Sequence, residues 1–280
     1  MERRTPWTLR RHTVVLALAL LFPACGAHPP ITLPRPDLRP PSHIDQVYGY
    51  QSAVTAIAAV IERELGVPPF PVTFDFYLDD AAFEKGLREL GHDPVTARET
   101  ARVMRGVGVP GRVLVNSQVL EPMSWGDRVR VLAHELVHSL QYQLAGGNRG
   151  TSEQWLREGF AEWVALMVLD RLRARPFAEL RDQQWAAFRG SARSRAPRLD
   201  EMIDFPQWIA VVSRPNVAVY SQAFLAAEVL VQRHGAPAVI SYFRQYASIP
   251  DRPTAFRAAF GEDPAAFEAV LEARLGIKRR

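Results

Sequence analysis

The sequence lacks the features that define several common protein classes. Its only cysteine among 280 residues is Cys25, which excludes a fold held together by intrachain disulfides. No internal repeat is present. The longest apolar run, the nine residues of Val14–Phe22, is too short to span a bilayer as a helix. We therefore expect neither a disulfide-stapled scaffold nor a repeat protein nor a membrane-spanning protein.

The sequence also lacks a strong charge of either sign. The formal net charge is +4, but four arginines and one glutamate precede Cys25. The 30 basic and 29 acidic side chains that follow leave a net charge of +1. Because no basic patch typical of nucleic-acid binding remains, we expect no nucleic-acid partner.

The N-terminus has the pattern of an export signal. Arginines at positions 3, 4, 10 and 11 precede the apolar run Val14–Phe22, as in the n-region and h-region of a secretory signal. Residues 1–24 are therefore predicted to be a signal peptide. This pattern indicates an exported protein of the bacterial cell envelope.

The segment after the apolar run offers two alternatives. Leu21-Phe-Pro-Ala-Cys25 resembles a bacterial lipobox, in which the cysteine carries a lipid and becomes the mature N-terminus. Lipidation of Cys25 would tether the protein to a membrane surface without spanning it. Ordinary cleavage near Ala24 or Ala27 would instead release a soluble periplasmic or secreted protein. Six prolines between residues 28 and 42 predict an extended spacer, so residues 25–42 are interpreted as a lipid-attachment cysteine and a tether.

The motif His134-Glu-Leu-Val-His138 carries the strongest chemical signal. Residues four apart on a helix lie on one face, so His134 and His138 can both reach one metal ion. Glu135 flanks that face and can act on a water molecule without joining the ligands. We interpret Glu135 as a general base. The alternative is a solvated surface helix, and apolar residues around most of the helix argue against it.

A second segment supplies a third ligand. Trp155-Leu-Arg-Glu158-Gly-Phe-Ala-Glu162 begins after a glycine-rich turn over residues 146–150, which would bring its helix antiparallel to the first. Glu158, separated from His138 by nineteen residues, can then point at both histidines. Glu162 lies one helical turn further on. It is predicted either to fix the tautomer of a ligand histidine or to be an exposed surface acid.

These residues together resemble the gluzincin metallopeptidases, the clan of thermolysin and aminopeptidase N, and small bacterial peptidase MA-like proteins. The resemblance implies a zincin-like fold with one Zn²⁺ per chain, bound by His134, His138 and Glu158. It implies Glu135 as catalytic base and Glu162 as the acid that orients the first ligand histidine. The Gly-Ala-Met-Glu-Asn motif of true aminopeptidases is missing. Gln141 and Leu144 stand where metzincins have glycine and histidine.

Tyr220 is assigned as the residue that stabilises the oxyanion of the tetrahedral intermediate. This residue follows Glu158 by 62 positions, a spacing similar to that of the catalytic tyrosine in the aminopeptidase branch. The alternative is an ordinary core tyrosine that opens a helix. His234 precedes a glycine at an apparent helix end and is interpreted as a capping residue. Tyr142 and Arg157 are weaker candidates.

Substrate binding is assigned to a short strand. Gly111-Arg-Val-Leu-Val-Asn116 alternates and follows Pro110, so it is predicted to be a strand over Val113–Asn116. In gluzincins the corresponding edge strand pairs with extended substrate, which implies Val113, Val115 and Asn116 as substrate-binding residues. The alternative is a plain sheet edge without this role.

The whole pattern predicts an α+β fold that is mostly helical, with a small N-terminal sheet and a helical C-terminal lobe in one domain over residues 43–280. One strand is expected over 72–78 and another over 113–116. Helices are expected over 52–65, 81–90, 96–104, 125–144, 153–173, 180–191, 217–233, 237–246 and 264–275.

The predicted function is a zinc metallopeptidase that acts on a peptide or protein substrate. Two alternatives use the same residues: a non-proteolytic zinc amidase for cell-wall peptides, and a catalytically silent binding lipoprotein of the same fold. The motif makes no prediction of oligomeric state.

Overall fold

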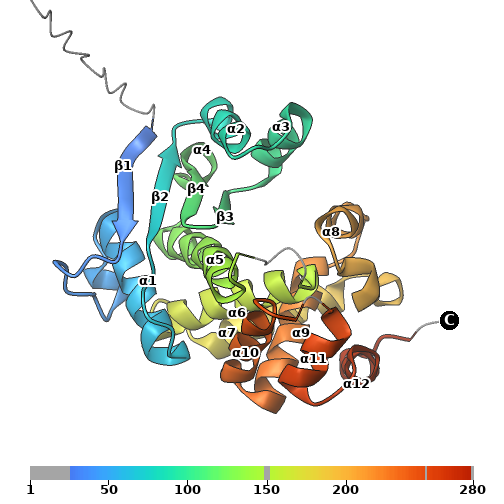
Figure 1. Cartoon of the computed structure of the whole chain (residues 1–280). Helices are drawn as coiled ribbons and strands as arrows, with labels where there is room; N and C mark the ends of the chain where they lie inside the picture. The colour runs from blue at the N-terminus through green and yellow to red at the C-terminus, as the bar shows by residue number, and fades with distance from the viewer. Residues whose placement is uncertain (1–25, 148–151, 250, 279–280) are drawn as a thin grey trace, which may run out of the picture.

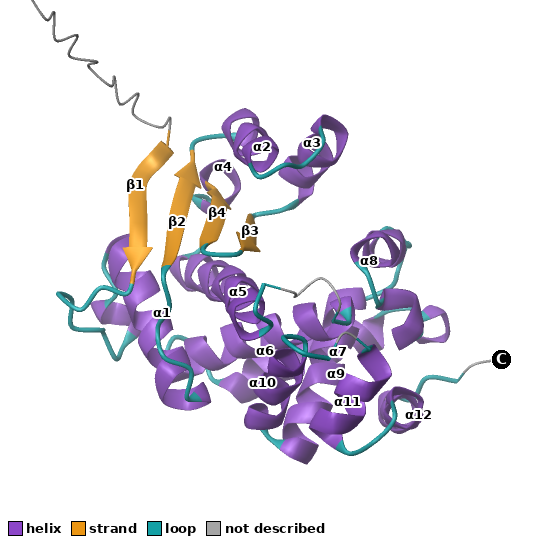
Figure 2. Ribbon diagram, in the orientation of Figure 1, coloured by secondary structure: helices purple, strands orange, loops and turns teal. Residues whose placement is uncertain are grey.

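The computed structural model describes residues 26–147, 152–249 and 251–278 (Figure 1). The architecture is α+β and mostly helical, with a small four-stranded sheet beside a larger group of helices (Figure 2). Among these residues, no helix combines the length and the apolar character needed to cross a membrane. The predicted fold class is therefore confirmed at the level of α+β with a small sheet.

The sheet has the order β1-β2-β4-β3. The strands are β1 (Gly26–Leu33), β2 (Val72–Tyr77), β3 (Gly106–Val109) and β4 (Arg112–Asn116). Strand β1 pairs antiparallel with β2, and β3 pairs antiparallel with β4. The two central strands, β2 and β4, pair parallel with each other. Alternate residues of β2 are buried, because side chains of a strand point to opposite faces of the sheet. The two edges of the sheet are thus β1 and β3.

Strand β1 corrects the predicted tether. Residues 26–33 belong to the folded domain and do not form an extended spacer. The prolines Pro29 and Pro30 lie where the register between β1 and β2 shifts, between His28 and Ile31. Proline lacks a backbone N–H, and an edge strand with a register shift is where a sheet accepts it. Cys25 and the predicted signal peptide over 1–24 lie outside the described residues.

A long helix lies between the sheet and a second long helix. Helix α5 (Trp125–Leu144) packs against β3 and β4 on one side and against α6 (Gln154–Arg171) on the other. Helix α6 packs in turn against α9 (Val219–His234). Gly159 allows the close approach of α6 and α9, because a Cβ atom there would lie 2.1 Å from the carbonyl oxygen of Ala223. The two predicted metal-binding helices therefore lie side by side at the centre of the molecule (Figure 1).

The remaining elements enclose this centre. Helix α1 (Gly49–Leu65) packs against β1 and α5, and it ends at Gly66, whose φ of 64° favours glycine. The other helices are α2 (Asp80–Glu89), α3 (Pro94–Val103), α4 (Ser117–Leu120), α7 (Phe177–Gly190), α8 (Phe205–Val212), α10 (Ala236–Gln245), α11 (Arg252–Phe260) and α12 (Pro264–Leu275), with 3₁₀ turns at Ile44–Gln46, Arg193–Arg195 and Leu199–Met202.

Candidate metal centre

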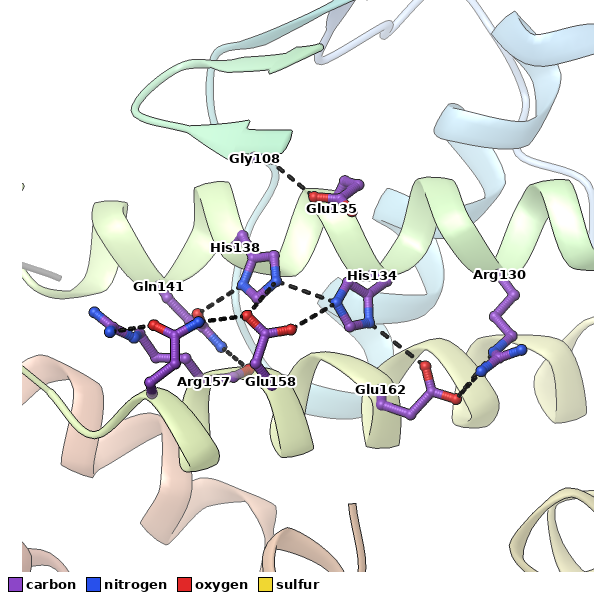
Figure 3. Close-up of polar contacts among 10 residues, drawn as sticks. Gly108, Arg130, His134, Glu135, His138, Gln141, Arg157, Glu158 and Glu162 are labelled. Carbon is purple, nitrogen blue, oxygen red and sulfur yellow. Dashed lines mark hydrogen bonds and ion pairs between the residues drawn. The ribbon is translucent and has the colours of Figure 1, made fainter. Parts of the chain in front are cut away.

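Helices α5 and α6 bring three predicted ligands together. The Nε2 atoms of His134 and His138 lie 3.1 Å apart. Glu158 places Oε2 at 3.4 Å from Nε2 of His134 and Oε1 at 3.6 Å from Nε2 of His138 (Figure 3). These three residues are the one group of metal-ligating side chains of this kind in the described part of the chain.

The spacing of the three ligands fits a tetrahedral metal ion. Zinc–nitrogen and zinc–oxygen bonds of about 2.0–2.1 Å at tetrahedral angles separate neighbouring ligand atoms by roughly 3.3–3.4 Å. The two nitrogens lie 3.1 Å apart, and different oxygens of Glu158 lie 3.4 and 3.6 Å from them, so the three side chains come close to that spacing. Two imidazoles and one carboxylate are also a donor set that suits zinc. The residues present therefore fit the ion that the motif implies.

The outer nitrogen of His134 faces an acid. Its Nδ1 lies 3.5 Å from Oε2 of Glu162, as predicted for the residue one turn after Glu158. Glu162 is held from the other side by Arg130, whose Nε donates to Oε1 at 2.9 Å (Figure 3). The side-chain amide of Gln184 also donates to this oxygen, at 3.2 Å. Because a carboxylate only accepts, this contact places a proton on Nδ1, and in the neutral imidazole it leaves the lone pair on Nε2.

The outer nitrogen of His138 faces an amide. Its Nδ1 lies 3.1 Å from Oε1 of Gln141, and Nε2 of Gln141 donates to the carbonyl oxygen of Arg157 at 2.9 Å. Glu158 has an amide partner as well, because Nε2 of Gln154 donates to its Oε1 at 2.6 Å. Each of the three ligands is thus held by a further polar side chain.

Buried charges shift the ionisation of this cluster. Burial by itself would lower the pKa of His134, but the carboxylates of Glu158 and Glu162 raise it to about 10. Burial by itself would raise the pKa of Glu158, but the charges and hydrogen bonds of His138 and His134 hold it well below its usual range. Glu162 has a lowered pKa for the same reason, with His134 and Arg130 opposing the effect of burial. A cation at the centre, a proton or a metal ion, is therefore strongly favoured.

Glu135 lies beside the ligands and is positioned by strand β3. Its Oε2 accepts a hydrogen bond from the backbone N–H of Gly108 at 2.9 Å, and its side chain is buried (Figure 3). The strand reaches the helix because it carries no side chain at two positions. A Cβ atom at Gly106 would lie 2.8 Å from Cγ of Glu135, and one at Gly108 would lie 2.2 Å from the carbonyl oxygen of Glu135. The two glycines therefore allow β3 to fix the predicted base.

Tyr220 lies in the first turn of α9 and is 42% exposed. Its ring packs edge-on against Trp208 of α8, with centroids 5.0 Å apart. Burial raises its pKa, and the negative charges of Glu158 and Glu135 raise it further. The hydroxyl is thus a neutral donor at neutral pH.

The predicted substrate strand is corrected by the sheet order. Val113, Val115 and Asn116 are fully buried, and β4 is paired on both sides, with β2 and with β3. An interior strand has no free backbone groups for an extended ligand, so the assignment of substrate binding to these residues is wrong. The edge beside the ligands is β3, which the sequence analysis missed because two of its four residues are glycine.

Several residues that support the site were also missed. Gln141 follows His138 by three positions and Arg130 precedes His134 by four, so each lies one helical turn from a ligand. That spacing was visible in the sequence. His234, interpreted as a capping residue, lies in the last turn of α9 and pairs with Glu262 at 3.0 Å.

Comparison with known proteins adds no relative. No model of a protein family, no curated protein and no solved structure matches the chain. The functional argument therefore depends on the geometry of the ligands and the chemistry of their neighbours.

Proposed function

We propose that this protein is a zinc-dependent metallopeptidase with a zincin-like domain. The observation that carries the proposal is the convergence of Nε2 of His134, Nε2 of His138 and the carboxylate of Glu158 within 3.1–3.6 Å of one another. Three acceptor atoms at these distances repel one another unless a cation lies between them. Glu135 on the adjacent side supplies the base that such chemistry requires.

Each residue has a distinct part in the proposed reaction. A zinc ion held by His134, His138 and Glu158 supplies Lewis-acid chemistry and water activation. Glu135 accepts a proton from the attacking water and passes it to the leaving nitrogen. The hydroxyl of Tyr220 donates to the oxygen that gains negative charge as the peptide carbonyl is attacked. The Gly108 N–H orients Glu135 throughout.

An extended substrate would pair with strand β3. This strand is an edge of the sheet, and it packs against the helix that carries Glu135. Strand addition would use the backbone groups of this edge other than the N–H of Gly108, which already donates to Glu135. We therefore infer that β3, in place of the interior strand β4, lines the path of the substrate.

The proposed location is the bacterial cell envelope, with a lipid on Cys25. The fold changes what such an anchor would do. Gly26 already pairs with Tyr77 in the sheet, so no spacer separates Cys25 from the domain. A lipid there would hold this end of the sheet at the membrane surface. Cell fractionation tests the anchor. We expect the wild type in the membrane fraction and the Cys25→Ser variant in the soluble fraction.

Peptide cleavage by the purified full chain tests the proposal. The zinc-loaded protein in detergent is mixed with a diverse peptide library, and mass spectrometry compares wild type with Glu135→Gln. We expect cuts by the wild type alone, because Glu135→Gln keeps the ligands and loses the base. Cleavage by Glu135→Gln would contradict the assignment of the base. Stoichiometric zinc without any cleavage would favour the amidase alternative, and cell-wall peptides would then be the next substrate.

The metal assignment has its own test. His138→Ala removes one of three ligands, so zinc measured per chain by atomic emission is expected to fall from one toward zero. His92→Ala is the matched control, because that histidine lies in the turn between α2 and α3. One zinc per chain in His138→Ala would contradict the proposed centre.

A further inference from the structure

Gln141 is a fully buried amide between the two metal-binding helices. It lies on α5 one turn after His138, and both ends of its amide are occupied. Oε1 lies 3.1 Å from Nδ1 of His138, and Nε2 donates to the backbone carbonyl of Arg157 at 2.9 Å (Figure 3). Arg157 directly precedes Glu158 in α6. One side chain therefore contacts a ligand of the first helix and the backbone next to a ligand of the second.

The direction of these hydrogen bonds follows from the carbonyl. A backbone carbonyl can only accept, so the NH₂ group of Gln141 must face Arg157. The amide oxygen must then face His138, and an oxygen of this kind can only accept as well. Nδ1 of His138 must therefore carry the proton. In a neutral imidazole this leaves the lone pair on Nε2, the atom that faces His134 and Glu158.

The amide also couples the two helices. Gln141 holds the backbone of Arg157 to α5, and this contact contributes to the stability of the packing between α5 and α6. A side chain without an amide at position 141 would leave Nδ1 of His138 and the Arg157 carbonyl without this shared partner. Hydrogen bonds in a buried network strengthen one another, so removal of one member weakens the hydrogen bonds of the others.

We propose that Gln141 is a positioning residue of the metal centre, which holds His138 in the tautomer that binds metal. This role rests on the proposed function only where zinc affinity is concerned. The tautomer of His138 is a property of the metal-free protein and is independent of any activity.

The experiment compares three variants of the full chain. Gln141→Met keeps an unbranched side chain of similar size without an amide. Gln141→Glu keeps an acceptor for Nδ1 of His138 but removes the donor to Arg157. Gln143→Met is the matched control, because Gln143 lies two residues further on the same helix and is exposed. The readouts are zinc affinity by chelator competition, the visible spectrum with Co²⁺ alone, and the tautomer of His138 by ¹⁵N NMR of the metal-free protein.

The expected results separate positioning from general support of the fold. Gln141→Met should lower zinc affinity by about 10- to 100-fold, alter the Co²⁺ spectrum and reduce the share of the Nδ1–H tautomer. Gln141→Glu should keep the tautomer and the affinity while its thermal stability falls. Gln143→Met should match the wild type in all three. If Gln141→Met does not fold, Gln141→Glu decides, because a purely structural role requires its affinity to fall together with its stability.

Two outcomes would overturn the inference. One is a folded Gln141→Met with wild-type tautomer and zinc affinity. The other is a Gln141→Glu whose zinc affinity falls as its stability falls. A wild-type chain that binds no zinc would instead contradict the proposed function, and the tautomer measurement would still decide the role of Gln141.

Discussion

The backbone N–H of Gly108 donates to Oε2 of Glu135 at 2.9 Å, so the edge strand of the sheet holds the predicted base of the neighbouring helix. The contact needs a strand that passes very close to α5, and a Cβ atom at Gly108 would lie 2.7 Å from Cβ of His138 as well. The position of Glu135 therefore depends on strand β3 as well as on helix α5, although the motif His134–His138 lies entirely on the helix.

Gly108→Ala should push β3 away from α5. The added methyl group would meet the carbonyl oxygen of Glu135 at 2.2 Å, so we expect a loss of about 1–3 kcal/mol in the free energy of unfolding, typical of overpacking, together with a loss of peptide cleavage. Urea denaturation measures the first and the peptide assay the second. Gly126→Ala is the control, because a Cβ atom there meets nothing within 4 Å. Unchanged stability and activity in Gly108→Ala would contradict the close approach.

Glu162→Gln should weaken zinc binding. The variant keeps an oxygen near Nδ1 of His134 but removes the negative charge that this nitrogen and Arg130 share. Loss of such a partner typically costs 10- to 100-fold in metal affinity, and we expect a loss of about tenfold by chelator competition. Glu179→Gln removes an acid from the exposed surface of α7 and should leave affinity unchanged. Equal zinc affinity in the two variants would contradict the predicted role of Glu162 in orienting His134.

Zinc binding should release a proton from His134. In the metal-free protein the pKa of His134 is raised to about 10, so the ring is charged at pH 8, whereas a ligand nitrogen must be neutral. Glu158 releases none, because its pKa is already low. We expect zinc affinity to rise about tenfold per pH unit between 7 and 10. Calorimetry in buffers of different ionisation enthalpy should show about one proton released, and a pH-independent affinity would contradict the shift.

The same shift makes the stability of the metal-free protein depend on pH. The folded pKa of about 10 exceeds the ordinary value of 6.5, so the contribution of His134 is complete below pH 6.5 and is lost as pH rises toward 10. Thermal unfolding of the metal-free chain should therefore occur at lower temperature at pH 10 than at pH 7. With zinc bound, His134 is already a neutral imidazole, and this particular loss should be absent.

Tyr220→Phe should slow peptide cleavage without loss of metal. The hydroxyl is expected to act on charge that develops only in the transition state, so kcat should fall by about 10²–10³ while KM and zinc content stay near wild type. Tyr48→Phe, at a tyrosine that is 81% exposed, is the control. An unchanged kcat in Tyr220→Phe would support the alternative of a tyrosine that only opens α9.

Glu153→Gln should stabilise the protein at neutral and higher pH. Burial raises the pKa of Glu153 to about 7, above its usual 4.5, so the wild type is most stable below pH 4.5 and loses this contribution as pH rises to about 7. The difference corresponds to about 3 kcal/mol at pH 8. Urea denaturation should show the variant more stable there and equal to the wild type near pH 4. Glu99→Gln, at an exposed acid on α3, should show no such pH dependence.

Local patterns predicted most of the helices. The predicted range 125–144 coincides with α5, and 264–275 coincides with α12. Glycines and prolines explain this success, since Gly66 and Gly276 end helices at positive φ and Pro264 begins one. Elements with weak or short patterns were missed: β1, β3, α4, α8 and α11. Helix α8 has a capping box at Asp204 and Gln207 that could have revealed it.

Strand β3 explains why strand β4 was predicted correctly but was assigned the wrong role in substrate binding. Pro110 and Gly111 mark a tight turn, and Gly111 adopts a φ of 68°. The strand after the turn was predicted, but the strand before it consists of Gly106-Val-Gly-Val109, which has almost no local preference for a strand. With its partner missed, β4 was taken for an edge. The strand at β1 was missed for a related reason, because its prolines resemble those of a spacer.

The sequence by itself predicted that His134, His138 and Glu158 lie together with Glu135 beside them, because their spacing along two helices fixes which residues share a face. Only the tertiary structure decided which groups hold them. Gly108 comes from a sheet edge and Gln184 from α7, and Gln141 reaches the Arg157 carbonyl of α6. These contacts depend on packing between distant segments. Helical periodicity is a local property of the chain, whereas the order of strands and the approach of β3 to α5 are set by burial of the whole core.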